Sequence, residues 1–480
     1  MVSSSKYKIP MAKKLSLGAV CALASLTACT LAPDYRAPEP VTPLTFKEAG
    51  PWVQATPASA ADAGAWWLAF NDPVLNALEA KIDSANPTLS EALGRYDEAR
   101  AYLGVARSDL YPSLGLGTSI TNNRQSDRRP LRGSNQPDLY AADTIGGGIG
   151  YELDLWGRVR NEVAARRADV AASADDVASV RLSLEAELAT DYIALRGVDQ
   201  DIDLLTRTVD AYSKADDLTH RRFVGGIANG IDVARSGTIL ADARAQLADA
   251  QNARALLEHA LASLTGTTAS TFTIAPSPTK LAMPSIPLGI PSTLLERRPD
   301  VAAAERRMYA ANREIGVARA AFYPSILLGG AGGYQSTALS GLISAPNVFW
   351  SIGPNVVLNL FDGGRRRARV ALARSEWTQA SSHYRETVLT GFQQVEDGLS
   401  RLHYLGDEAS EEDHAATQAA QAEQLALNRY SKGASNYLDV VTAQTAALAA
   451  SKRSIQVSVA RQEAIIGLLR ALGGGWRHTA

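Results

Sequence analysis

Cysteine is nearly absent from this chain of 480 residues, and its scarcity excludes two kinds of chemistry. The two cysteines, Cys21 and Cys29, both lie in the first thirty residues. The rest of the chain has no thiol that could form a disulfide framework or act as a nucleophile. Structural disulfides and thiol catalysis are therefore excluded for the body of the protein.

An excess of charge of one sign is also lacking, since 48 lysine and arginine residues stand against 50 aspartate and glutamate residues. Nothing global therefore indicates a nucleic acid partner. The six histidines form no short metal-ligand motif, and the glycine-rich run 146–150 lacks the Gly-Lys-Ser/Thr ending of a phosphate-binding loop. We expect no metal site, no cofactor and no enzymatic activity.

The N-terminus has a hydrophobic run that is too short to span a bilayer but long enough for a signal peptide. Lysines precede the uncharged run 15–28, which ends in Leu-Thr-Ala before Cys29. This ending matches the bacterial lipoprotein cleavage box. We expect residues 1–28 to be a signal peptide and Cys29 to carry an S-diacylglycerol and an N-palmitoyl group.

Two points about this N-terminus stay open in the sequence. An ordinary secretory signal with an incidental cysteine is the alternative to a lipoprotein signal, and translation could begin at Met1 or at Met11. If Cys29 is lipidated, Thr30 stands where an aspartate would favour retention in the inner membrane. The outer membrane is therefore the expected location.

The body of the chain contains an internal duplication. Eight residues recur 212 positions later, and further residues recur at a spacing of 207. The first set is Pro87, Gly104, Val105, Ala106, Arg107, Tyr111, Pro112 and Ser113, which recur as Pro299, Gly316, Val317, Ala318, Arg319, Tyr323, Pro324 and Ser325. The second set includes Gly157, Arg158, Asp232 and Val233, which recur as Gly364, Arg365, Asp439 and Val440. Five residues are lost between the two sets, which indicates a shorter surface loop in the second copy.

Each copy contains a segment with the pattern of a membrane β-hairpin. Residues 111–155 hold two extended runs on either side of a polar stretch, 122–143, and residues 323–361 repeat the design. No charged residue occurs between Arg319 and Asp362, and aromatic residues gather near the ends of the runs. Uncharged strands with aromatic ends are typical of outer-membrane β-barrels. A soluble hairpin packed on a core is the alternative.

Long proline-free segments follow each hairpin. The helical pattern of 157–224 predicts a helix roughly 100 Å long at 1.5 Å per residue. A glycine-rich turn returns the chain into a helix that ends at 264, and 363–472 repeats this arrangement. Alanines dominate the apparent seams and predict close-packed antiparallel coiled coils. These include Ala164, Ala171, Ala174, Ala178, Ala186, Ala241, Ala245 and Ala248.

The remaining segments complete the predicted organisation. Residues 29–73 form an extended, lipid-anchored segment, and a helical pattern covers 74–109 at the start of the first repeat, 74–265. A proline-rich linker, 266–293, precedes the second repeat, 294–472, and a short tail, 473–480, ends the chain.

The number of strands forces oligomerisation. Four strands cannot close, and a sheet in a membrane must close because unpaired backbone groups cannot face lipid. Two copies give a barrel whose lumen is filled by side chains, whereas three give twelve strands and room for a pore. The long helices exceed the thickness of any bilayer and should project into the periplasm as an α-helical barrel continuous with the β-barrel.

Several stretches of the chain carry a resemblance to a known family. They are residues 294–301, 310–312 and 315–324, with Trp66, Trp67, Phe70, Asp72, Pro73 and Leu75, and with Cys29, Pro33, Tyr35 and Pro38 near the N-terminus. These stretches resemble the TolC-like outer membrane efflux factors, and within them the lipoprotein branch that serves resistance-nodulation-division pumps. The resemblance covers essentially the whole mature chain. It implies a homotrimer with a twelve-stranded barrel, an equatorial mixed belt, a periplasmic adaptor protein and an inner-membrane pump as partners, and contact with outer-membrane lipid.

The resemblance also assigns candidate sites at the two helix turns. The inner hairpin of the periplasmic tip, where such proteins close their tunnel, is matched by Tyr430, Gly433, Leu438 and Asp439. Thr442 belongs to the same expected gate, although relatives often carry an acid there. The expected adaptor-docking turns contain Gly225, Gly226, Asp232, Gly433 and Asn436. The alternative for the two aspartates is a purely structural role, because a helix N-terminus favours an acidic side chain.

The sequence therefore predicts a passive exit duct that carries drugs or other small toxic compounds across the outer membrane. A type I secretion duct for proteins and a metal-ion efflux duct are alternatives within the same family. A periplasmic coiled-coil lipoprotein without a pore is the alternative from a different class.

Overall fold

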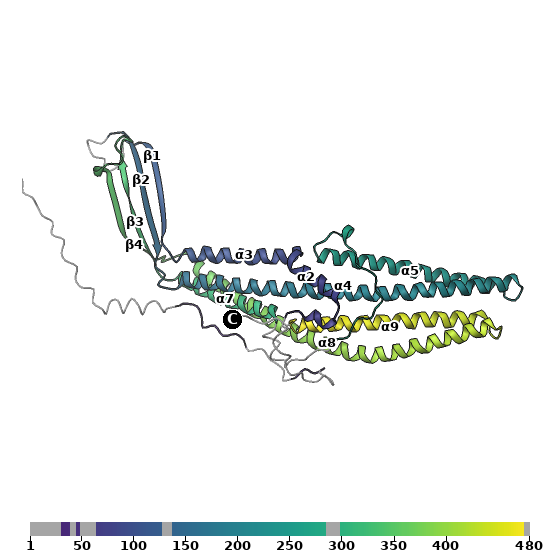
Figure 1. Ribbon diagram of the computed structural model, residues 1–480. Helices are drawn as coiled ribbons and strands as arrows, with labels where there is room; N and C mark the ends of the chain where they lie inside the picture. The colour runs from purple at the N-terminus through teal and green to yellow at the C-terminus, as the bar shows by residue number, and fades with distance from the viewer. Residues whose placement is uncertain (1–29, 39–44, 49–63, 127–136, 285–297, 475–480) are drawn as a thin grey trace, which may run out of the picture. The chain divides into compact units, whose positions relative to one another are not determined.

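A computed structural model describes most of the chain (Figure 1). The described residues are 30–38, 45–48, 64–126, 137–284 and 298–474. The expected signal peptide 1–28 and the lipidation site Cys29 lie outside them, as do residues 294–297 of the family-like stretch and the end of the tail.

The chain divides into two compact units, and each takes corresponding parts from both repeats. One comprises Met1–Ala37, Glu98–Val170 and Arg306–Ser381, and contains the strands. The other comprises Pro38–Asp97, Ala171–Glu305 and Ser382–Ala480, and contains the helical hairpins. We call them the strand unit and the hairpin unit.

The strand unit is built on one antiparallel sheet with the order β1-β2-β3-β4. Its strands are β1 (Ser113–Arg124), β2 (Leu139–Glu152), β3 (Ser325–Ser336) and β4 (Val348–Val357). The two predicted hairpins are thus confirmed and lie next to each other, joined by the β2–β3 pairing. β1 and β2 also extend into the polar stretch 122–143 that we expected to be a loop, because Asn123 and Tyr140 still pair across the hairpin.

The helical pattern predicted over 74–109 is interrupted. It forms α2 (Pro73–Ala85) and α3 (Pro87–Ser108), which are separated at Asn86. Pro87 has no amide hydrogen to continue a helix, although it suits the first position of the next one. The Asn86 side chain accepts from the Leu89 amide at 3.0 Å and donates to the Leu264 carbonyl at 2.8 Å, so it anchors the break.

The long helical hairpins are α4 (Arg158–Val224) with α5 (Gly230–Leu264), and α8 (Arg365–Ser431) with α9 (Tyr437–Ala471). Helices α4 and α8 have 67 residues each, and α5 and α9 have 35 each, so both copies keep the spacing of 207. Helices α3 and α7 (Pro299–Ala320) keep the spacing of 212. In the described part of the chain, none of the helices combines the length and apolar character needed to cross a bilayer.

Alanines do pack between the helices, but partly at other positions than predicted. In α5 the buried alanines are Ala243, Ala250 and Ala262, whereas Ala241, Ala245 and Ala248 are exposed on the single chain. A helix with alanine on every side gives the sequence pattern no contrast from which to choose the packed face.

Candidate functional site

The two hairpin turns have the same backbone construction. After α4, the Ile227 and Ala228 amides donate to the Arg222 carbonyl, and Gly226 has φ of 72°. After α8, the Ala434 amide donates to the Arg429 carbonyl at 2.8 Å, and Gly433 has φ of 76°. Glycine adopts this left-handed conformation without steric cost, which explains its recurrence in both turns.

An asparagine caps each returning helix. The Asn229 side chain accepts from the Asp232 amide at 2.9 Å, and the Asn436 side chain accepts from the Asp439 amide at 3.1 Å. Each aspartate thus lies in the first turn of its helix, as predicted. Asp232 is half-buried and Asp439 is exposed, so the two repeat-equivalent carboxylates have different surroundings.

Tyr430 lies at the centre of a buried cluster that joins the tips of the two hairpins. Its ring meets the Tyr437 ring edge-on at a centroid distance of 5.1 Å, and both pack with Val440. The guanidinium of Arg222 on α4 lies 4.6 Å from the Tyr430 ring centroid and donates to the Tyr430 carbonyl at 2.7 Å. A cation over an aromatic ring together with a hydrogen bond to its backbone fixes one hairpin tip on the other.

Sequence reasoning identified Tyr430 but missed Arg222. The available signal was the duplication, because the spacing of 207 pairs Arg222 with Arg429 and Phe223 with Tyr430. The symmetry is broken in the structure, since Arg429 is exposed and donates to the carbonyl of Ala434 in its own turn, at 3.5 Å.

The other expected gate residues lie on the exposed side of α9. Leu438 is 45 % exposed, and Asp439 and Thr442 are also exposed. The Thr442 hydroxyl donates to the Leu438 carbonyl at 2.9 Å, so the hydrogen of this hydroxyl is bonded within the helix. Among these three residues, only Asp439 supplies a charge.

The sheet has two unlike faces, which follow from the strand register because directly paired residues share a face. One face carries large apolar side chains and is called the apolar face. Its members include Leu114, Leu116, Ile120, Ile145, Ile149, Leu328, Trp350, Ile352 and Val356. The other, the small-residue face, is mostly glycine, alanine, serine, threonine and asparagine, with Tyr140, Leu327, Phe349 and Val357 as larger exceptions.

Aromatic side chains lie at the end of the sheet where the strands connect to the helices. The Trp156 and Tyr323 rings stack at a centroid distance of 4.7 Å, and the Trp156 indole donates to the Pro324 carbonyl at 2.7 Å. Amphipathic rings at the ends of apolar strands are typical of the interface between a bilayer and water.

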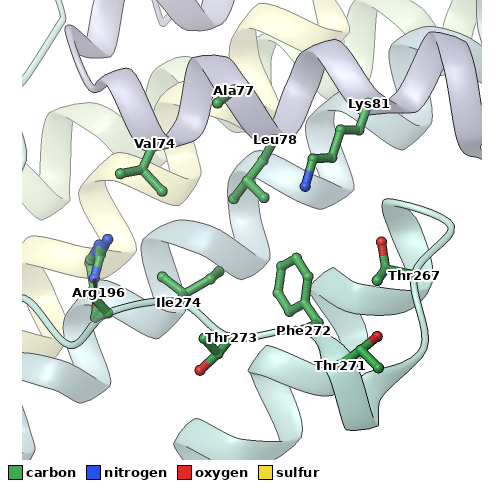
Figure 2. A pocket seen from close by; sticks show the side chains of 11 residues that line it. Val74, Ala77, Leu78, Lys81, Arg196, Thr267, Thr271, Phe272, Thr273 and Ile274 are labelled. Atoms are coloured by element: carbon green, nitrogen blue, oxygen red, sulfur yellow. Dashed lines mark hydrogen bonds between the residues drawn. The ribbon is translucent and has the colours of Figure 1, made fainter.

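The hairpin unit also holds an open cavity of about 400 Å³ between α2, α4 and the segment 267–275. Figure 2 shows Val74, Leu78 and Lys81 projecting from α2 toward Phe272 and Ile274. The Lys81 ammonium lies 5.8 Å from the Phe272 ring centroid. The lining is mainly apolar and was not anticipated from the sequence.

A buried ion network holds the wall of this cavity in place. Asp199 pairs with Arg196 at 2.9 Å and with Arg254 at 2.7 Å. The two arginines donate to the carbonyls of Ala275 and Ile274 respectively, and Asp199 accepts from the Ser277 amide. The charged side chains on the helices are thus hydrogen-bonded to one another and to the backbone of the linker. The network therefore fixes the start of the linker on the helices. In the described ranges, no three His, Cys, Asp or Glu side chains gather as a metal site.

Comparisons with known proteins agree with this architecture. The sequence profile of a family described as outer membrane efflux protein matches residues 80–267 and 290–474. Outer membrane protein OprJ of Pseudomonas aeruginosa is 33 % identical over 470 residues, covering 97 % of each chain. Toluene efflux pump outer membrane protein TtgF of Pseudomonas putida is 29 % identical over 466 residues, covering 94 % of this chain and 95 % of TtgF.

A solved structure gives the same result for the fold. The open state of the MtrE outer membrane channel of Neisseria gonorrhoeae superimposes with a TM-score of 0.79 at 26 % identity. The match covers 94 % of this chain and 99 % of that one.

Proposed function

The chain belongs to the outer membrane efflux protein family, and from that membership we propose that three copies form the exit duct of a tripartite efflux pump. The proposed cargo is small organic compounds, the class indicated by the name of the toluene efflux relative, TtgF. The proposed partners are a periplasmic adaptor protein and an inner-membrane resistance-nodulation-division pump, since the duct itself offers no means of using energy.

The observation that carries the proposal is the sheet with two unlike faces. Within the described residues, β1 and β4 are each paired along one side only. Such edges cannot remain open in lipid, so neighbouring copies are the groups that would pair with them. The apolar face then meets lipid, and the small-residue face lines a lumen wide enough for solutes.

The periplasmic gate is proposed at the hairpin tip. Leu438 and Asp439 are exposed on the single chain, so threefold symmetry would bring three copies of each together around the axis. Tyr430 and Arg222 hold the hairpin tip from which these residues project. The turns with Gly225, Gly226, Asp232, Gly433 and Asn436 are the proposed adaptor contacts, and Thr442 is the remaining proposed gate residue.

The lipid anchor is proposed at Cys29, from the cleavage box alone. Cys29→Ser should abolish incorporation of labelled fatty acid into the mature protein. Retention of the label would place the lipid elsewhere. Because the barrel itself inserts into the membrane, some transport activity should remain in this variant.

Single-channel recording in planar bilayers tests the proposed duct. We expect discrete conductance steps from the purified protein, and a membrane-inserted protein that never conducts would contradict the proposal.

A pair of neighbouring substitutions tests which face meets lipid. Ile352→Arg places a charge on the apolar face, where it costs about 2–4 kcal/mol near the bilayer centre, and should reduce membrane insertion. Ser351→Arg, on the small-residue face, should insert normally and shift the ion preference toward anions. Equal insertion of both variants would contradict the assignment of the faces.

A further inference from the structure

The strand unit contains a cluster of arginines where β4 leads into α8. Arg365, Arg366, Arg367 and Arg369 occupy the first turns of this helix. Among these four arginines, only Arg366 has an ion-pair partner in the residues that the structure describes. Its guanidinium contacts Asp362 at 2.7 Å and lies 5.3 Å from the Phe322 ring centroid.

The other three arginines are exposed, and none of them has an ion pair within the described part of the chain. Arg365 and Arg369 are one helical turn apart and lie on the same face, where like charges destabilise a helix. The start of a helix also disfavours cations, because its dipole is positive there. The backbone at this helix end is already capped by Asp362, which accepts from the Gly364 and Arg366 amides. The free donors are therefore the guanidiniums.

In the first repeat, the corresponding arginines have carboxylate partners within the chain. Arg158, the counterpart of Arg365, pairs with Glu152 at 2.8 Å and with Glu162 at 3.1 Å. Its neighbour Arg160 pairs with Asp154 at 3.2 Å. The first copy thus neutralises its arginines within the chain.

At the spacing of 207, all three of these carboxylates are absent from the second copy. Glu152 corresponds to Asn359, Asp154 to Phe361 and Glu162 to Arg369. The ion pair between Arg158 and Glu162 thus becomes the like-charged pair of Arg365 and Arg369. The second copy keeps Arg365 and Arg369 but lacks these three carboxylates, so both guanidiniums are available to an anion from outside the chain.

The segment before these arginines indicates where that anion is found. Leu360 is 87 % exposed and Phe361 is 86 % exposed, and both lie between the end of β4 at Val357 and the start of α8. Exposed apolar and aromatic side chains followed by basic ones are typical of a chain that leaves the hydrocarbon layer at the headgroup level. In a bacterial outer membrane the headgroups on the periplasmic side include anionic phospholipids.

We propose that Arg365 and Arg369 bind the phosphate of an anionic phospholipid in the periplasmic leaflet, while Leu360 and Phe361 contact its acyl chains. Two guanidiniums on one helix face can share one phosphate through paired hydrogen bonds. This inference rests on the placement of the sheet in the outer membrane proposed above. It adds a lipid site in the second repeat that the first repeat lacks.

Native mass spectrometry of the full-length assembly, after exchange into phosphatidylethanolamine with or without phosphatidylglycerol, tests this site. The wild type should retain phosphatidylglycerol severalfold over phosphatidylethanolamine. Arg365→Gln with Arg369→Gln should remove most of this preference. Arg235→Gln with Arg385→Gln removes the same charge from exposed positions in the hairpin unit and should leave the preference unchanged.

A second variant separates lipid binding from folding. Arg369→Glu rebuilds the ion pair of the first repeat, so it should lose the lipid preference while the assembly stays as stable as wild type in detergent. The proposal is overturned if the wild type shows no preference, or if the double variant keeps it. It is also overturned if the double variant dissociates into single chains with its lipid preference intact, since the arginines would then bind a neighbouring copy. A protein that selects phosphatidylglycerol but never conducts would contradict the duct and leave the lipid site standing.

Discussion

Glu79 is an acidic residue in surroundings that disfavour its charged form. It lies on α2 in the hairpin unit and is 3 % exposed, and among the described residues neither of its carboxylate oxygens has a hydrogen-bond partner. Burial, with a smaller effect from the nearby Glu185 carboxylate, raises the pKa of Glu79 to about 9. Burial also raises the pKa of Glu185 to about 7, against the opposing effect of the Trp66 indole, which lies 3.4 Å from it. Glu79 is therefore protonated in the folded protein at neutral pH.

This protonation makes the stability depend on pH in a defined direction. The ordinary pKa of 4.5 applies to Glu79 in the unfolded chain, so between pH 4.5 and about 9 folding takes up a proton. The free energy of unfolding is highest below that range and falls as pH rises through it. At pH 7 the loss amounts to about 3 kcal/mol per chain.

Glu79→Gln keeps the size of the side chain and cannot ionise, so it should remove most of this dependence. We expect the variant to melt several degrees above wild type at pH 8 and at the same temperature at pH 5, by thermal unfolding in detergent. Glu98→Gln, at an exposed position, is the matched control and should change neither value. An unchanged pH slope in the Glu79 variant would show that the proton is held elsewhere.

At the scale of single elements, the gate prediction depends on the first turn of α9. Asp439→Asn removes three negative charges from the proposed ring and should lower cation selectivity severalfold in single-channel recordings. The assembly should keep its stability, because an acidic side chain at a helix N-terminus contributes only about 0.3–1 kcal/mol. Leu438→Gly should raise resting conductance by opening the apolar constriction.

Asp232→Asn is the matched control that the duplication offers. This half-buried residue occupies the equivalent position on α5, away from the proposed ring, and its loss should leave ion preference unchanged. If the Asp232 variant alters selectivity and the Asp439 variant does not, the gate lies on the turn after α4.

The internal duplication made most helices and strands predictable from the sequence. The helices and hairpins were found because each pattern occurs twice at a fixed spacing, and proline or glycine marks their ends. The break at Asn86 was missed, because a proline at the first position of a helix looks the same as one inside a longer helical pattern. Arg222 was missed because its function depends on Tyr430, a residue 208 positions away.

At the scale of the whole molecule, two features of the single chain are explained by contact with further copies of it. Two sheet edges are unpaired in the described residues, and Ala241, Ala245 and Ala248 are exposed at the spacing of a packed helix face. Small residues at such spacing allow close helix packing when another helix is present. Assembly therefore completes both the sheet and the helical wall. The need for further copies could be predicted from the number of strands in one chain.

Cysteine cross-linking can count the copies, because the chain has no cysteine after Cys29. Gly115 and Ser351 lie on the small-residue face of the two outermost strands, β1 and β4. Neighbouring strands of a closed barrel are staggered, so Gly115→Cys combined with Ser351→Cys, treated with a bifunctional thiol reagent long enough to span that stagger but not the lumen, should link β4 of one copy to β1 of the next. We expect covalent dimers and trimers and nothing larger on denaturing gels, since twelve strands close the barrel. Each single-cysteine variant should cross-link far less, because its thiols are separated by the lumen. A ladder that stops at dimers, or continues beyond trimers, would contradict closure by three chains.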